Sequence, residues 1–292
     1  MQHNITHWSA PAKLNLFLYI NGRRSDGYHE LQTLFQFIDL GDDLEISVNY
    51  NDQITISPEI PGVPLTENII YQAAIALKQH STLPHGADIC LTKNLPMGGG
   101  LGGGSSDAAT TLVALNKLWQ LQLTEDQLAA IGLTLGADVP VFVRGQAAFA
   151  EGIGEQLTPI DVSESWYLIV VPPTHVNTAQ LFADPNLTRD TLKRPLNQLL
   201  EDEWINDFET TVKKRHPEVA KALEWLLKYA PSRLTGSGCC VFSEFNRKSD
   251  ALKVLADAPK HMQIYLAKGL NKSPLLHDLE RHNNTTTENW MI

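Results

Sequence analysis

NLPMGGGLGGGSSD, which runs from Asn94 to Asp107, places six glycines among the seven residues from Gly98 to Gly104. A glycine run loses much conformational entropy when it becomes ordered, so it is typical of a backbone that adopts left-handed dihedral angles and approaches a ligand closely. Backbone N–H groups in such a loop, together with the start of a following helix, form an anion site. The stretch therefore predicts a phosphate-binding loop.

The segments on both sides of this run support that interpretation over a flexible linker. Ala87 to Lys93 alternates as a strand, and Thr124 with Gln127 predicts a capping box at the start of a helix over Thr124 to Leu133. Between them, Ser105 to Trp119 predicts a helix with one apolar face, formed by Ala108, Ala109, Leu112, Leu115 and Trp119. The glycine run is thus expected to connect a strand to a helix.

Two common phosphate loops do not fit. Gly98-x-Gly100-x-x-Gly103 matches the dinucleotide pattern, but a helix follows where a βαβ unit needs a strand, which disfavours an NAD-dependent oxidoreductase. The P-loop pattern fails because Gly104 stands where a lysine is required. A different nucleotide loop is needed.

The rest of the chain predicts an α+β protein of two domains. Strands are expected at Lys13–Ile20, Leu44–Tyr50, Gln53–Ile56, Ala87–Lys93, Trp166–Val171, Cys239–Phe242 and Gln263–Ala267, and further helices at Asn68–Lys78, Leu196–Leu200, Asp207–Arg215 and Pro217–Tyr229 and between the last two strands. Asp26-Gly27 predicts a turn, and the apolar residues Leu31, Leu34, Phe35 and Ile38 fit either a helix or an irregular segment. We place the domains at residues 1–154 and 155–276, and expect residues 277–292 to form a flexible tail.

Composition and charge exclude several classes of protein. The chain has 292 residues, 43% of them hydrophobic, and a net charge of −10, so we expect a folded protein that does not bind nucleic acid. No segment has the length and apolarity of a membrane span or signal peptide, and three cysteines are too few for a disulfide framework, so a cytoplasmic location is expected. The adjacent Cys239 and Cys240 are interpreted as small core residues, and the histidine spacing predicts no protein metal site.

The glycine loop and two other motifs carry a specific resemblance. Pro96-x-x-x-Gly100-Leu101-Gly102-Gly103-Gly104-Ser105-Ser106 resembles the phosphate loop of the galactokinase, homoserine kinase, mevalonate kinase and phosphomevalonate kinase superfamily. SAPAKLNLFL (Ser9 to Leu18) and LTGSGCCVF (Leu234 to Phe242) resemble its first and third motifs, in the same order. The resemblance covers about Trp8 to Leu275. It implies an N-terminal ribosomal-protein-S5-like α/β domain, a C-terminal ferredoxin-like α+β domain and an active site in the cleft between them.

Two stretches point to one branch of this superfamily. SDGYHELQTLFQFIDLGD and LTLGADVPVFVRGQAAFAEGIGE resemble the branch that phosphorylates the C2 hydroxyl of methylerythritol linked to cytidine diphosphate, in non-mevalonate isoprenoid biosynthesis. The resemblance implies ATP as the phosphoryl donor, bound by Pro96, Met97, Gly98, Gly99, Gly100, Leu101, Gly102, Gly103, Gly104, Ser105 and Ser106. Magnesium is expected to arrive with the phosphates of ATP. A monomer and a homodimer both remain open.

The same resemblance assigns the catalytic pair. Asp138, in Gly-Ala-Asp-Val-Pro, would by itself be read as a helix-end or turn residue, and Lys13 as an outward-facing lysine on a strand. The resemblance makes Asp138 the base that accepts the hydroxyl proton and Lys13 the cation beside it. Their joint presence argues against a nucleotide-binding sensor that has lost turnover. Asn15 shares the strand face of Lys13 and is expected to bind the substrate.

Four further residues are expected to bind the acceptor. Tyr28 and His29 follow the Asp26-Gly27 turn, where a purely structural role beneath a hairpin is the alternative. The resemblance makes both substrate contacts, with His29 at the pyrimidine edge and an aromatic ring on its face, for which Phe182 is a second candidate. Thr178 is assigned to the same wall. Asn177 and Ala179 depart from the family pattern there, where prolines often stand.

Overall fold

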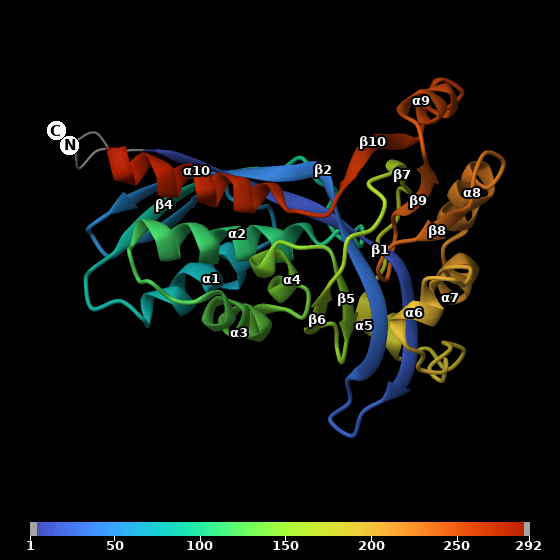
Figure 1. Ribbon diagram of the computed structural model, residues 1–292, viewed down its shortest axis with the longest axis horizontal. Coiled ribbons are helices and arrows are strands. Elements are labelled where there is room, and N and C mark those ends of the chain that lie inside the picture. The colour runs from blue at the N-terminus through green and yellow to red at the C-terminus, as the bar shows by residue number, and fades with distance from the viewer. Residues whose placement is uncertain (1–4, 289–292) are drawn as a thin grey trace.

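The computed structural model describes residues 5–288, which form two α/β bodies connected by one long hairpin (Figure 1). The strands are β1 (Thr6–Arg23), β2 (His29–Asn49), β3 (Ile54–Ser57), β4 (Gly86–Thr92), β5 (Ala148–Glu151), β6 (Gln156–Pro159), β7 (Trp166–Val171), β8 (Ser232–Leu234), β9 (Val241–Phe245) and β10 (Gln263–Leu270). The helices are the 3-10 turn η1 (Leu65–Glu67), α1 (Ile69–Lys78), α2 (Gly103–Leu118), α3 (Glu125–Leu135), α4 (Val139–Arg144), α5 (Thr178–Phe182), α6 (Leu196–Leu199), α7 (Glu209–Arg215), α8 (Pro217–Leu226), α9 (Lys248–Ala256) and α10 (Pro274–Glu288).

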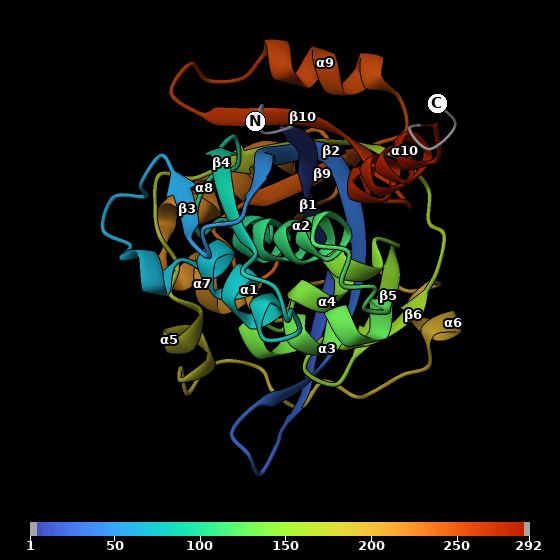
Figure 2. The ribbon, with the colours of Figure 1, turned by 90° about the vertical axis from the view of Figure 1, so that its left-hand side faces the viewer.

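The β1–β2 hairpin is the longest feature of the fold and extends from the first body alongside the second (Figures 1 and 2). β2 pairs along its length with β1, while its other edge takes β5, then β10, then β4. The segment from Leu31 to Ile38, for which we expected a helix or an irregular course, is part of strand β2. That expectation was wrong because both faces of this part of β2 are covered, so its apolar residues do not alternate.

Helix α2 is the centre of the first body. It packs on β1 and β2, and α1, α3 and α4 lie around it (Figure 1). The predicted apolar face is confirmed, since its residues are all buried: Ala108, Ala109, Leu112, Leu115 and Trp119. The predicted caps are confirmed too. Asn68 Oδ1 accepts from Ile70 N at the start of α1, and Thr124 with Gln127 forms the capping box of α3.

The second body is an antiparallel sheet in the order β10, β7, β9, β8. Helix α8 packs against β8 and β9, and α9 against β7, β9 and β10. A shared cluster of buried residues joins the two bodies, with Phe17 and Leu34 from the hairpin, Leu101 from the glycine loop and Tyr167 and Phe242 from the second sheet. Burial of large apolar side chains across this junction stabilises the relative position of the motifs.

The expected domain boundary at residue 154 falls within a hairpin of the structure. Gly154 lies in the turn of the β5–β6 hairpin, in which Phe149 pairs with Thr158, so the chain leaves the first body only after Pro159. The sequence pattern did not indicate the pairing of β6 with β5, and the boundary at residue 154 stays a prediction.

The C-terminal segment is a helix through Glu288, so the flexible tail expected from residue 277 is wrong for the described part; residues 289–292 lie outside it. Helix α10 returns to the first body and lies along β1 (Figure 1). Leu275 is fully buried in the first core, and Asp278 Oδ2 accepts a 2.7 Å hydrogen bond from Ser9 N. No helix among residues 5–288 is long and apolar enough to span a membrane.

Candidate active site

The glycine loop, residues 96–106, joins β4 to α2 as predicted. Gly98, Gly100 and Gly102 have φ angles of +70°, +80° and +75°. Residues other than glycine rarely adopt this region of the backbone. Gly102 is the N-cap of α2 and has no side chain to satisfy the first N–H groups of the helix. Free N–H groups at a helix start attract anions, so the local geometry suits phosphate.

Backbone contacts tie the three motifs to one another. Lys13 N, in the first motif, donates to Leu101 O at 3.0 Å, and Cys240 N, in the third, donates to Gly99 O at 3.0 Å. A Cβ atom on Gly100 would collide with the Thr235 carbonyl oxygen, so only glycine allows the loop to lie on this turn. The three segments, far apart in the sequence, therefore form one rigid unit.

Lys13 and Asp138 are brought together at this unit. Lys13 Nζ lies 3.2 Å from Asp138 Oδ2, with side-chain exposures of 3% and 34%. Asp138 precedes α4 but its side chain makes no capping hydrogen bond, which leaves its carboxylate available to a ligand. Lys13 Nζ also donates to Asn15 Oδ1 at 2.5 Å and to Gly100 O at 3.2 Å. The lysine is thus fixed on several sides, while the aspartate faces open space.

Asn15 connects this pair to the third motif. Its backbone N–H donates to Thr235 Oγ1 at 2.9 Å, and its side-chain amide donates to Thr33 Oγ1 at 2.8 Å. Asn15 is nearly fully buried, yet it lines the same cavity as Lys13 and Asp138. Its amide orientation is therefore set by the protein before any ligand binds.

A cavity of about 970 Å³ opens in front of the Lys13–Asp138 pair, and we call it the acceptor cavity. The glycine loop, the Thr235–Gly238 turn, the tip of the β1–β2 hairpin and α5 all contribute to its wall. Every acceptor residue expected from the sequence lines it: Asn15, Tyr28, His29, Thr178 and Phe182.

His29 and Phe182 form a stacked pair in this wall. Their ring centroids are 4.4 Å apart and the planes differ by 18°. Burial lowers the pKa of His29, and the positive charges of Arg189 and Arg23 lower it further, which favours the neutral imidazole. Its Nε2 is buried without a hydrogen-bond partner among the described residues. Tyr28, in contrast, is largely exposed at the rim, so His29 and not Tyr28 is the ring beside Phe182.

Thr178 links the second body to the third motif. Its hydroxyl oxygen lies 2.6 Å from Ser237 Oγ. Thr178 is the first residue of α5, whose N-cap Asn177 accepts from Gln180 N at 3.0 Å. Asn177 thus starts the helix with a side-chain cap at the position where the sequence departs from the family pattern.

A second cavity, of about 450 Å³, lies on the other side of the glycine loop, and we call it the donor cavity. Its wall combines the loop with apolar residues from the segment after β3, Ile60 and Val63, and from the start of α1, Ile69 and Ile70. Gly98, Gly100, Gly102 and Ser105 line both cavities. Two ligands bound in the two cavities would therefore meet at the loop.

Lys93 lies at the floor of the donor cavity between two buried carboxylates. Its Nζ is 2.5 Å from Asp42 Oδ2 and 2.8 Å from Asp107 Oδ2. Burial raises the pKa of Asp107 to about 7; Lys93 opposes this shift and Asp42 adds to it. Burial would lower the pKa of Lys93, but the charges and hydrogen bonds of both aspartates outweigh it and raise that pKa.

The loop residues expected to bind nucleotide are not equivalent. Pro96, Met97, Gly98, Gly99, Gly100, Leu101, Gly102, Gly103, Gly104 and Ser105 line the donor cavity. Ser106 does not line it: its hydroxyl is fully buried and has no hydrogen-bond partner among residues 5–288. A role for Ser106 through its side chain is therefore not supported by its position.

Several residues at the site were missed by the sequence reasoning. Lys93 and Asp107 flank the glycine run, Arg23 precedes the hairpin turn, and Ser237 and His175 come from the second body. Lys93 and Asp107 could have been predicted, because both are charged residues next to a predicted phosphate loop in the sequence. His175 carried no signal, since its place against Gly98 depends on the packing of the two bodies.

Among residues 5–288, no group of three or more His, Cys, Asp or Glu side chains could hold a metal ion. The predicted core role of the cysteine pair agrees with the structure, since Cys239 and Cys240 are buried free thiols. Any divalent cation at this site would take most of its ligands from a bound phosphate and water.

Family models match both bodies: GHMP kinases N terminal domain over residues 68–146 and GHMP kinases C terminal over residues 187–264. The chain is 59% identical over 276 residues to the 4-diphosphocytidyl-2-C-methyl-D-erythritol kinase of Psychromonas ingrahamii, covering 94% of this chain and 97% of the relative. It is 58% identical over 268 residues to the protein of the same name from Tolumonas auensis, covering 92% and 94%.

Solved structures agree with these matches. A crystal structure of 4-(cytidine 5'-diphospho)-2C-methyl-D-erythritol kinase superposes with a TM-score of 0.79 at 30% identity, covering 90% of this chain and 99% of that one. The mevalonate kinase of Methanococcus jannaschii superposes with a TM-score of 0.66 at 17% identity over 92% and 99%, which shows a shared fold alone. The predicted two-domain fold class is thereby confirmed.

Proposed function

Since the chain belongs to the family of 4-diphosphocytidyl-2-C-methyl-D-erythritol kinases, we propose that it transfers the γ-phosphoryl group of ATP to the C2 hydroxyl of 4-diphosphocytidyl-2-C-methyl-D-erythritol. The products are the 2-phosphate and ADP, in non-mevalonate isoprenoid biosynthesis. The observation that carries the proposal is the Lys13–Asp138 pair, 3.2 Å apart, in the acceptor cavity, where Lys13 also bonds to Gly100, a residue that lines both cavities.

The chemistry follows from the two side chains. Asp138 accepts the proton of the C2 hydroxyl while the hydroxyl oxygen bonds to the γ-phosphorus and the bond from phosphorus to the ADP oxygen breaks. Lys13 keeps the carboxylate in place and stabilises negative charge on the phosphoryl oxygens. We expect direct transfer, without a phosphoenzyme, because the two cavities share the glycine loop as part of their walls.

The donor cavity suits ATP. Its apolar residues offer a surface for the adenine, and the glycine loop with the start of α2 offers N–H groups for the phosphates. Magnesium, when bound with ATP, would offset phosphate charge, and Ser105, which lines both cavities, offers a hydroxyl oxygen from the loop. The free thiols of Cys90, Cys239 and Cys240 suit a reducing cytoplasm as the place of the reaction.

The acceptor cavity suits a cytidine at the end distant from the catalytic pair. His29 lines this end of the cavity, stacked on Phe182, and the ring of Phe182 offers an aromatic surface. A neutral imidazole can donate from one nitrogen and accept at the other, as recognition of a base edge requires. Asn15 and Thr178 contribute polar side chains to the same cavity wall.

The test is a phosphoryl-transfer assay with Mg-ATP and four acceptors: 4-diphosphocytidyl-2-C-methyl-D-erythritol, mevalonate, homoserine and galactose. We expect phosphorylation of the first alone. Transfer only to mevalonate or homoserine would contradict the proposal. ATP binding without transfer to any acceptor would favour a sensor that has lost turnover.

A further inference from the structure

The acceptor cavity has four basic side chains in its described lining: Lys13, Arg23, His29 and His175. Lys13 is held by Asp138, Asn15 and Gly100. His29 is buried, stacked on Phe182 and favours its neutral form. His175 packs against Gly98 of the glycine loop, where its Nδ1 would lie 2.7 Å from a Cβ atom. Only Arg23 among the four carries a permanent charge that no acidic group in the described chain engages.

Arg23 is placed beside the cytidine end of the cavity by the register of the hairpin. It is the last residue of β1 and pairs directly with His29 of β2, so the two side chains lie on the same face of the sheet. The pKa of His29 supports this placement, because the charge of Arg23 contributes to lowering it, after burial and Arg189. We therefore expect its guanidinium to reach the diphosphate that is attached to the ribose.

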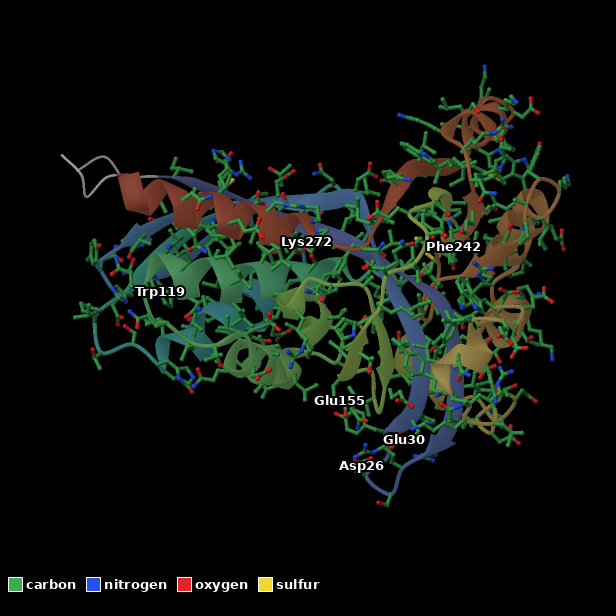
Figure 3. All side chains as sticks on the ribbon, viewed as in Figure 1. Asp26, Glu30, Trp119, Glu155, Phe242 and Lys272 are labelled. Atoms are coloured by element: carbon green, nitrogen blue, oxygen red, sulfur yellow. The ribbon has the colours of Figure 1, made fainter. Side chains whose placement is uncertain are left out.

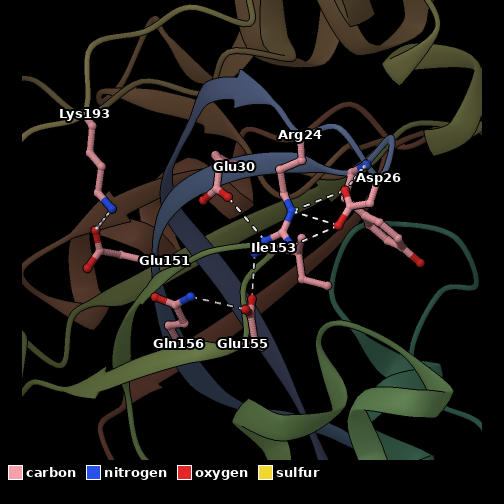
Figure 4. A network of polar contacts seen from close by, with 9 residues as sticks. Arg24, Asp26, Glu30, Glu151, Ile153, Glu155, Gln156 and Lys193 are labelled. Atoms are coloured by element: carbon pink, nitrogen blue, oxygen red, sulfur yellow. Dashed lines mark hydrogen bonds and ion pairs between the residues drawn. The ribbon is translucent and has the colours of Figure 1, made fainter.

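Two other arginines, Arg24 and Arg189, differ from Arg23 because their side chains already have partners within the protein. Arg24, the next residue, has Nη2 2.9 Å from Asp26 Oδ2 and Nη1 3.3 Å from Glu30 Oε1 (Figure 4). Arg189 donates to the backbone carbonyls of Leu187, Phe182 and Asp184. The side chain of Arg23, in contrast, makes no hydrogen bond or ion pair with any of residues 5–288, and it is exposed at the cavity wall.

The surrounding charges favour a free arginine at this place for an anionic acceptor. The chain carries a net charge of −10, and acidic side chains gather at the tips of the β1–β2 and β5–β6 hairpins, where Asp26, Glu30 and Glu155 lie close together (Figure 3). A diphosphate entering past these carboxylates is repelled unless a local cation offsets them. The planar guanidinium is well suited to this task, because it donates two parallel hydrogen bonds to phosphate oxygens.

We propose that Arg23 binds the diphosphate of the acceptor and so selects a nucleoside-diphosphate-linked alcohol over neutral polyols. This inference rests on the proposed function for the identity of the acceptor. Arg23 acts in binding and selection, and the proton transfer and the phosphoryl transfer stay with Lys13 and Asp138.

The first experiment measures steady-state constants for Arg23→Gln, Arg23→Lys and Arg24→Gln. Loss of a charged hydrogen bond predicts a rise in the KM for the acceptor of roughly ten- to a hundredfold in Arg23→Gln, with kcat and the KM for ATP nearly unchanged. Arg23→Lys keeps the positive charge but not the two parallel N–H donors of the guanidinium, so its KM for the acceptor should rise less than that of Arg23→Gln. Arg24→Gln makes the same charge change one residue away, and we expect less than about a threefold effect from it. Equal rises in the acceptor KM for Arg23→Gln and Arg24→Gln would overturn the proposal. They would indicate an effect of the overall positive charge and not a direct contact between Arg23 and the diphosphate.

The second experiment needs no turnover and separates this inference from the proposed function. Calorimetry compares the binding of cytidine diphosphate and of cytidine to the wild type and to each variant, after melting curves have verified folding. We expect the wild type and Arg24→Gln to prefer cytidine diphosphate, and Arg23→Gln to lose most of that preference. An unchanged preference in Arg23→Gln, or no preference in the wild type, would overturn the role of Arg23. Failure of wild-type transfer to the expected acceptor, with these binding results intact, would instead contradict the proposed function alone.

Discussion

The two cavities on either side of the glycine loop each contain a lysine paired with carboxylate, but the pairs differ in exposure. Lys13 is 3% exposed and faces Asp138, which is 34% exposed. Lys93 is 26% exposed and faces Asp42 and Asp107, which are 0% and 4% exposed. In the acceptor cavity the cation is buried and the carboxylate is reachable; in the donor cavity the arrangement is reversed.

The partners of the carboxylates explain what the difference means. Asp42 accepts from Lys93 and from the backbone N–H groups of Asn94 and Leu95, at 2.7 and 2.8 Å, so it fixes the strand end that leads into the loop. Asp138 accepts only from Lys13 among the described residues and can take a proton from a ligand. We therefore propose that the Lys13–Asp138 pair serves the chemistry and that the Lys93 pair holds the loop.

The largest expected effect comes from breaking the acceptor-side pair. Asp138→Asn keeps the shape of the side chain but removes the base, so kcat should fall by roughly two to four orders of magnitude. ATP affinity, measured by calorimetry, should stay close to that of the wild type. The equivalent change on the other side, Asp107→Asn, is expected to act mainly on stability. Turnover like that of the wild type in folded Asp138→Asn would remove this residue from the mechanism.

The next effect concerns Gly100, which both cavities share. Gly100→Ala places a Cβ atom against the Thr235 carbonyl and forces a φ of +80° on a side chain that resists it. We expect at least a tenfold loss of affinity for both ATP and the acceptor, read by calorimetry, and a lower melting temperature.

Gly104→Ala is the comparison variant, because the nearest atom to its Cβ would be Ile69 Cγ2 at 3.9 Å and its φ is not left-handed. A clearly smaller loss is expected for it. Loss of affinity for ATP alone in Gly100→Ala would show that the loop serves only the donor cavity.

A change confined to the acceptor cavity should have a selective effect. Phe182→Ala removes an aromatic surface worth about 1 to 3 kcal/mol for a stacked base, which corresponds to roughly a five- to hundredfold weaker acceptor affinity. ATP affinity should not change. Similar losses for both ligands would indicate local unfolding, since Phe182 also packs edge-on against Phe208 at 5.0 Å.

The sequence predicted some parts of the site and fold and not others. The glycine loop, the capped helices and the Lys13–Asp138 pair were all predictable, because short-range patterns and motif resemblance define them. The stacking partner of Phe182 was not, since it depends on how the β1–β2 hairpin, with Tyr28 and His29 adjacent on it, meets α5. The return of α10 to the first body was missed, although Leu275, Leu276 and Leu279 in PLLHDL have helical spacing.

The smallest expected effect is the pH dependence of stability that Asp107 contributes in the donor cavity. The folded-state pKa of Asp107 is about 7, above its usual 3.8, because burial and Asp42 outweigh the attraction of Lys93. Between about pH 4 and 7 the folded protein therefore binds more protons than the unfolded chain, so this group's contribution to stability is present at low pH and is lost as pH rises to 7.

Asp107→Asn removes that loss while the amide oxygen can still accept from Lys93. The variant should be more stable than the wild type at pH 8, by roughly 1 to 3 kcal/mol, and the difference should shrink toward pH 4. Urea unfolding at both pH values measures it, with Asp126→Asn, an exposed aspartate on α3, as a control for general charge. A variant less stable than the wild type at pH 8 would mean that the ionised pair with Lys93 stabilises the fold more than burial of its charge costs. The two lysine pairs would then be alike in stability and would differ only in whether a ligand can reach the carboxylate.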